Sequence, residues 1–132
     1  MISIDANPVP NGELSLQTVA MPKDTNARGD IFGGWLLSQM DLAASVAAQK
    51  IARGRVATVA VDNMSFLVPV NVGAVISCYT DITKIGRSSI VVLVEVWMKD
   101  INFNKALTKV TEGSFVFVAI NDRGLTRGIS KN

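Results

Sequence analysis

The chain has 132 residues, of which 48% are hydrophobic, which is enough for one domain with one core. Thirteen basic and eleven acidic side chains give a net charge of +2, and no basic stripe indicates a nucleic-acid partner. The absence of histidine excludes Ser-His-Asp and Cys-His hydrolysis and ordinary zinc hydrolase sites, so we expect no metal or cofactor.

The single cysteine and the lack of long apolar runs restrict the location of the protein. Cys78 lies in an alternating apolar segment and is expected to be a buried, unpaired thiol. No signal-peptide pattern and no run long enough to cross a membrane is present. We therefore expect a cytoplasmic protein that forms one domain over residues 1–132, with loose termini at 1–12 and 122–132.

A strand and a long helix are predicted in the first half of the chain. Residues 14–20 read as a strand, and a polar loop follows at 22–28. Asp30 can cap or sit beside a helix start, and residues 35–52 then continue without proline or glycine. One face of this helix is apolar, and it holds Leu36, Met40, Ala43, Ala44, Ala47 and Ile51, whereas Ser38, Ser45 and Gln49 lie opposite.

Four more strands are predicted after the helix. The expected strands are 55–62, 73–85, 88–99 and 106–121, with an irregular connector at 63–71, a tight turn at Gly86 and Arg87, and a polar link near 100–105. The order β-α-β-β-β-β predicts an α+β fold in which one helix covers one face of an antiparallel sheet. Because the strand over 88–99 is apolar on both faces, we expect an oligomer that covers the second face.

Asp41 is the most interesting polar residue of the predicted helix, because it lies on the shoulder between the apolar and polar faces. A partly desolvated carboxylate there suits a general base, although a helical aspartate is commonly structural. Gly33 and Gly34 form either a plain turn or a place where backbone N–H groups meet an oxyanion. Asn26 is either an ordinary turn residue or part of the same site.

A distance argument relates these groups to the oligomer. Asp41 follows Gly34 by seven residues, so the two lie about 10 Å apart along one helix axis, too far to serve one carbonyl. If two copies pair with antiparallel helices, the Gly34 end and Asn26 of one chain can face Asp41 of the other. This arrangement predicts a site at a dimer interface.

Four segments resemble one family, the hotdog-fold acyl-CoA thioesterases of the YciA type. The segments are MPxDTNxxGDIFGGWxxSQMD at 21–41, GRVxTVAV at 54–61, FxxPV at 66–70 and GRSSI at 86–90. The resemblance implies a hotdog fold in which a long helix is wrapped by a five-stranded sheet. It also implies dimers with a continuous sheet, and trimers of such dimers.

The same resemblance implies an activity, the hydrolysis of acyl-CoA to CoA and a carboxylic acid. Its catalytic pair maps onto Asn26 and Asp41 of opposite subunits, and the carbonyl-polarising region maps onto Gly33 and Gly34. The CoA-contacting segment maps onto Arg87, Ser88 and Ser89. A non-catalytic acyl-CoA-binding protein on the same fold is the alternative, whereas a hotdog dehydratase would be expected to use histidine. Neither a nucleic-acid nor a membrane partner is expected.

Overall fold

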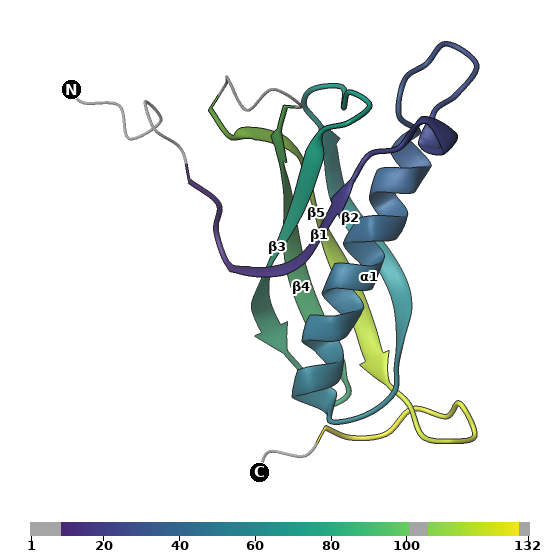
Figure 1. Cartoon of the computed structure of the whole chain (residues 1–132). Helices are drawn as coiled ribbons and strands as arrows, with labels where there is room; N and C mark the ends of the chain where they lie inside the picture. The colour runs from purple at the N-terminus through teal and green to yellow at the C-terminus, as the bar shows by residue number, and fades with distance from the viewer. Residues whose placement is uncertain (1–8, 101–105, 130–132) are drawn as a thin grey trace, which may run out of the picture.

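The computed structural model describes residues 9–100 and 106–129, and in them one helix crosses one face of a five-stranded antiparallel sheet (Figure 1). Spatially the strands follow the order β1-β3-β4-β5-β2. This is the α+β arrangement expected from the sequence. In chain order the elements are β1 (Glu13–Val19), the 3-10 turn η2 (Pro22–Asp24), α1 (Gly33–Ala52), β2 (Val56–Phe66), β3 (Val75–Ile85), β4 (Ser89–Lys99) and β5 (Thr108–Ala119).

The core lies between α1 and the sheet face that it covers. The apolar row of β4 points to this side and is almost fully shielded from solvent, as its alternation predicts. The helix is turned slightly from the expected orientation, since Ala47 and Ile51 are only half-buried. The buried residues of α1 are Leu36, Met40, Ala43, Ala44, Ala48 and Ala52. Small alanines on this face allow the helix to lie close to the sheet.

Strand β2 is longer than expected, and the prediction of a connector from residue 63 is wrong for its first four residues. Asn63 has a left-handed backbone with φ of 56°, and the pairing with β5 shifts register between Asp62 and Ser65. A bulge therefore interrupts the alternation while the strand continues to Phe66. Strand β3 begins at Val75 instead of 73, because Gly73 has φ of 91° and forms part of a turn.

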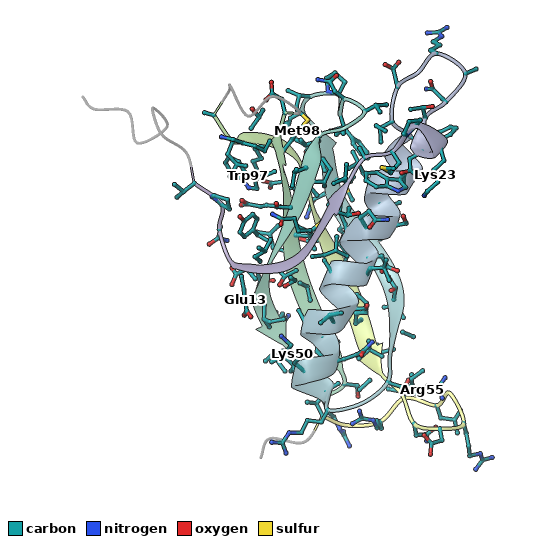
Figure 2. All side chains as sticks on the ribbon, in the orientation of Figure 1. Glu13, Lys23, Lys50, Arg55, Trp97 and Met98 are labelled. Atoms are coloured by element: carbon teal, nitrogen blue, oxygen red, sulfur yellow. The ribbon has the colours of Figure 1, made fainter. Side chains whose placement is uncertain are left out.

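The outer face of the sheet carries a charged network as well as apolar side chains. Glu95 and Trp97 alternate with the core row of β4, and both are buried. The Trp97 indole Nε1 donates a 2.9 Å hydrogen bond to Glu95, whose other oxygen lies 3.5 Å from Lys109 Nζ (Trp97 is labelled in Figure 2). Burial lowers the pKa of Lys109, but the carboxylates of Glu112 and Glu95 more than offset it and raise this pKa. The outer face is thus less uniformly apolar than expected.

The described parts of both termini, 9–12 and 122–129, which were expected to be loose, make hydrogen bonds to the rest of the domain. The Asn11 N–H donates to Glu95 at 3.1 Å. At the other end of the chain, Arg127 donates to the carbonyl of Ala52 at 2.8 Å, and so holds the C-terminal segment against the end of α1. Residues 1–8, 101–105 and 130–132 lie outside the described residues.

Candidate active site

Asn26 organises the loop that precedes α1. Its side-chain oxygen accepts hydrogen bonds from the N–H groups of Arg28 (2.9 Å) and Asp30 (3.1 Å), which fixes the orientation of the amide because both partners are donors. This is the turn role that the sequence left open. Among the described residues the Asn26 Nδ2 has no hydrogen-bond acceptor. The amide therefore keeps an unused N–H donor on a loop that its own oxygen holds in place.

The first turn of α1 begins with Gly33 and Gly34 and has no side-chain cap. Phe32 occupies the N-cap position, and its carbonyl accepts from the N–H groups of Trp35 and Leu36. Asp30, which was expected to cap or flank this start, is exposed and does not cap the helix. Within the described part of the chain, the N–H groups of Gly33 and Gly34 have no acceptor. Because the helix dipole places positive charge here, the two groups can hold a carbonyl oxygen that gains negative charge.

Asp41 is half-buried on α1, on the shoulder position expected from the helical pattern. One of its oxygens accepts a 2.7 Å hydrogen bond from the hydroxyl of Thr58 on β2. Thr58 lies at a register shift between β2 and β5, where the strand bends. A carboxylate oriented by a hydroxyl in this way is suited to accept a proton from water.

The sequence gives no reason to single out Thr58, because it is one β-branched residue in an alternating strand. Only the register of β2 against α1 places its hydroxyl beside Asp41, and that register depends on tertiary packing. Thr58 could have been identified only from the position of β2 relative to α1 in space.

The turn between β3 and β4 holds Arg87 and the two serines of the GRSSI motif. The Gly86 N–H donates to the Ser89 carbonyl at 2.8 Å, which closes the turn. A Cβ on Gly86 would lie only 2.5 Å from the Ser89 hydroxyl oxygen, so any other residue there would require that hydroxyl to move. The Arg87 side chain is exposed and makes no hydrogen bond or ion pair within the described residues. A free guanidinium on a fixed turn is suited to contact a phosphate.

One chain does not bring these groups together. The loop with Asn26 and the start of α1 lie at one end of the molecule, and the Arg87 turn lies at the other, next to the end of the helix (Figure 1). Asp41 of α1 and its hydrogen-bond partner Thr58 of β2 lie between the two ends. Since α1 has 20 residues and is therefore about 30 Å long, no small ligand contacts both ends of the same chain.

Exposed apolar side chains surround the Asp41 region. Leu42 and Val46 of α1 are 54% and 44% exposed, although serines and glutamine were expected to dominate this face. Val59 and Val61 on β2, which is an edge strand, are also exposed. An edge strand with free backbone groups beside an apolar patch is typical of a surface that another chain covers.

The described residues contain no cluster of ligands that could hold a metal ion. They also contain no helix that is long and apolar enough to span a membrane. Arg55, between α1 and β2, donates to the carbonyls of Asn121 and Asp122 at 3.2 Å each, so this arginine is engaged in holding the C-terminal segment (Arg55 is labelled in Figure 2).

Comparison with known proteins identifies close relatives. Residues 28–103 match the model of the thioesterase superfamily. The chain is 50% identical over 120 residues to the acyl-CoA thioester hydrolase YciA of Salmonella typhimurium, covering 89% of this chain and 90% of that protein. Among solved structures, a hexameric thioesterase from Yersinia pestis is 52% identical, with a TM-score of 0.89 over 94% of this chain and 100% of that one.

A more distant relative has been solved with ligands and as several variants. An acyl-CoA hydrolase from Staphylococcus aureus is 29% identical, with a TM-score of 0.78, over 86% of this chain and 69% of that one. It has been solved with butyryl-CoA and with CoA. Variants of the same hydrolase replace an aspartate, a threonine or an asparagine by alanine.

Proposed function

The chain belongs to the thioesterase superfamily, and we propose that it hydrolyses acyl-CoA thioesters at a site shared by two subunits. The observation that carries this proposal is the hydrogen bond between Thr58 and Asp41. In the Staphylococcus aureus hydrolase, the replaced asparagine, aspartate and threonine are separated by 15 and 17 positions. Asn26, Asp41 and Thr58 have the same spacing in this chain. The match supports a common catalytic group of three residues.

The proposed site takes its residues from two antiparallel helices. One subunit supplies Asn26 and the free N–H groups of Gly33 and Gly34, and the other supplies Asp41 and Thr58. The exposed patch on α1 and β2 supports this pairing, because two copies would bury it and join their sheets at the β2 edges. In that arrangement Gly34 and Asp41 of one site come from different chains. The distance of about 10 Å between them along one helix axis is then no obstacle.

In the proposed reaction a water molecule attacks the thioester carbonyl carbon. Asp41 accepts a proton from this water, Thr58 keeps the carboxylate in position, and the helix-start N–H groups stabilise the negative oxygen. The carbon–sulfur bond then breaks, and CoA leaves as a thiolate that takes up a proton from the site or from water. Asn26 orients the water or the thioester through its Nδ2 group. Direct attack by Asp41 on the carbonyl is the alternative route.

We propose that the CoA moiety extends from the thioester toward the β3–β4 turn, where Arg87, Ser88 and Ser89 contact it. The free guanidinium of Arg87 supports this role, because bidentate arginine contacts suit phosphate groups. The Yersinia pestis relative is hexameric, which supports a trimer of dimers here as well. We take residues 1–132 to act as one domain, and cell fractionation would test the expected cytoplasmic location.

Free thiol release from a panel of acyl-CoA esters tests the proposal, with the unmodified protein and Asp41→Asn assayed side by side. Release by the unmodified protein and a large loss in the variant are the expected results. Binding of acyl-CoA without any release would favour the non-catalytic alternative, against which the relatives named as hydrolases already weigh.

A further inference from the structure

The C-terminal segment, residues 126–129, folds back from the end of β5 to the β3–β4 turn. The Arg127 N–H donates at 2.9 Å to the carbonyl of Ala119, the last residue of β5. Two residues later, the Ile129 N–H donates to the carbonyl of Arg87 at 2.8 Å. Figure 1 shows this segment in yellow, passing the end of α1. A short piece of chain thus connects the end of the helix to the backbone of the residue proposed to contact CoA.

The side chain of Arg127 anchors this segment. It is half-buried, and its guanidinium donates to three carbonyls, those of Ala52 (Nη2, 2.8 Å), Ile120 (Nε, 3.1 Å) and Gly128 (Nη1, 3.5 Å). The Ala52 carbonyl is one of the last four of α1, which have no partner inside the helix. A Cβ on Gly54 would lie 2.9 Å from Nη2, so the guanidinium is packed against the chain that leaves the helix. One side chain therefore joins α1, the end of β5 and the C-terminal segment.

The backbone of the β3–β4 turn is held from the same region, because two of its carbonyls accept hydrogen bonds from there. The Ala119 N–H donates to Ser88 at 2.8 Å, and the Ile129 N–H donates to Arg87. The Ile129 side chain also packs against the core, which fixes the far end of the segment. Since the Arg87 side chain has no partner of its own within the described residues, its backbone alone determines where the guanidinium can reach.

We propose that Arg127 is a positioning residue for substrate binding, because it holds the C-terminal segment so that the turn presents Arg87 to the phosphates of CoA. The inference rests on the proposed thioesterase function. The Nε, Nη1 and Nη2 groups of Arg127 all donate to carbonyls of the protein, whereas the guanidinium of Arg87 has no acceptor in the described part of the chain. The two arginines therefore have different tasks, and Arg127 acts only through the turn.

The competing explanation is that Arg127 only caps the end of α1. A cation that donates to the last carbonyls of a helix stabilises it through the helix dipole. If that were its whole role, loss of the side chain would lower the free energy of unfolding and leave the affinity for CoA esters unchanged. The two explanations thus differ in their effect on substrates with and without phosphates.

The test compares an acyl-CoA with the acyl-pantetheine of the same acyl group, which has the thioester but no phosphate or nucleotide. Arg127→Ala should raise KM for the acyl-CoA by roughly twofold to tenfold, because Arg87 must then be ordered during binding. The kcat for this substrate, and kcat/KM for the acyl-pantetheine, should stay nearly unchanged. An equal loss with both substrates, or no loss with either, overturns the inference and leaves the hydrolase function intact. If the unmodified protein hydrolyses neither ester, the proposed function fails as well.

A double variant tests whether Arg127 acts through Arg87. In the Arg87→Ala background, the further change Arg127→Ala should alter KM for the acyl-CoA by less than about twofold, because the contact to be positioned is already absent. If the two effects on KM multiply instead, Arg127 acts independently of Arg87 and the inference is wrong.

Arg123→Ala is the matched control, because it removes a nearby arginine whose side chain is exposed and makes no hydrogen bond or ion pair within the described residues. It should leave KM for both substrates unchanged. Arg127→Lys keeps the charge but not the planar fork that spans several carbonyls, so it should raise KM for the acyl-CoA by less than Arg127→Ala does. If Arg127→Ala does not fold, this variant decides the question, because an unchanged KM for the acyl-CoA would then overturn the inference.

Discussion

The hydroxyl of Thr58 on β2 donates a 2.7 Å hydrogen bond to the carboxylate of Asp41 on α1. This contact joins an edge strand to the helix, so the position of the proposed base depends on two elements at once.

Asp41→Asn should lower kcat for thiol release by roughly 10²- to 10⁴-fold, because the amide has the shape of the carboxylate but cannot accept the proton. An assay of the CoA thiol released over time measures the effect, and thermal unfolding checks that the variant is folded. Unchanged thiol release would remove Asp41 from the mechanism.

Thr58→Ala should lower kcat by roughly tenfold or more, since a hydrogen bond to a charged group contributes about 1.5–3 kcal/mol. Thr58→Ser keeps the hydroxyl and is the matched control, so it should retain most of the activity. Equal losses in the two variants would indicate that the methyl group, and not the hydrogen bond, is what matters.

Gly34→Ala separates stability from activity. A Cβ at this position meets no atom within 4 Å in its own chain, and alanine favours a helix over glycine, so the free energy of unfolding should rise by about 0.5–1 kcal/mol. The added methyl would crowd a thioester held at the helix start, and kcat/KM should fall by roughly 10²-fold. Denaturant unfolding and thiol release measure the two effects. A stabilised variant with full activity would argue against ligand binding at this turn.

Arg87→Ala should raise KM by roughly tenfold and leave kcat nearly unchanged, because a phosphate contact is the same in the ground and transition states. Arg123→Ala removes an exposed arginine of the C-terminal segment, outside the β3–β4 turn. This variant serves as the control and should leave KM unchanged. A fall in kcat at constant KM for Arg87→Ala would contradict a role in binding.

Cys78 makes stability depend on alkaline pH. Burial raises the pKa of its thiol from 9.0 to about 12, so the folded state keeps a proton that the unfolded state loses. The stabilising contribution is complete below pH 9 and is lost as the pH rises toward 12, with a slope of about 1.4 kcal/mol per pH unit. Denaturant unfolding of the unmodified protein and of Cys78→Ala, compared at pH 8 to 11, should show that the free energy of unfolding falls more steeply in the former, by this slope. Parallel pH profiles would contradict it.

The periodic parts of the fold could be predicted from the sequence. The helix and the pairing of β3 with β4 follow from spacings of apolar residues that are local in the chain. The continuation of β2 to Phe66 could not, because the bulge at Asn63 breaks the alternation and is stabilised by β5, which is distant in sequence. The ties of Arg127 to the end of α1 were missed for a similar reason, since no local pattern marks them.

The candidate site was predicted in part. The shoulder position of Asp41 follows from helical geometry, and the structure shows that it is half-buried there. The double glycine was expected near the helix start, but only the structure shows that the first turn is uncapped and that Phe32 is its N-cap. Thr58 depends on the packing of a strand against a helix, which no spacing along one chain reveals.

The central claim is that each site takes Asn26 from one subunit and Asp41 from another, and mixed oligomers test it directly. Asn26→Ala and Asp41→Asn chains are co-expressed with different tags, and assemblies that contain both are purified and assayed for thiol release. If the site is shared, half of the sites in each mixed dimer are intact, so purified mixed dimers should have about half of the activity of the unmodified protein, and purified hexamers of randomly paired chains should have about a quarter. If both residues act within one chain, every site lacks one of them, and the mixture will be as inactive as the separate variants.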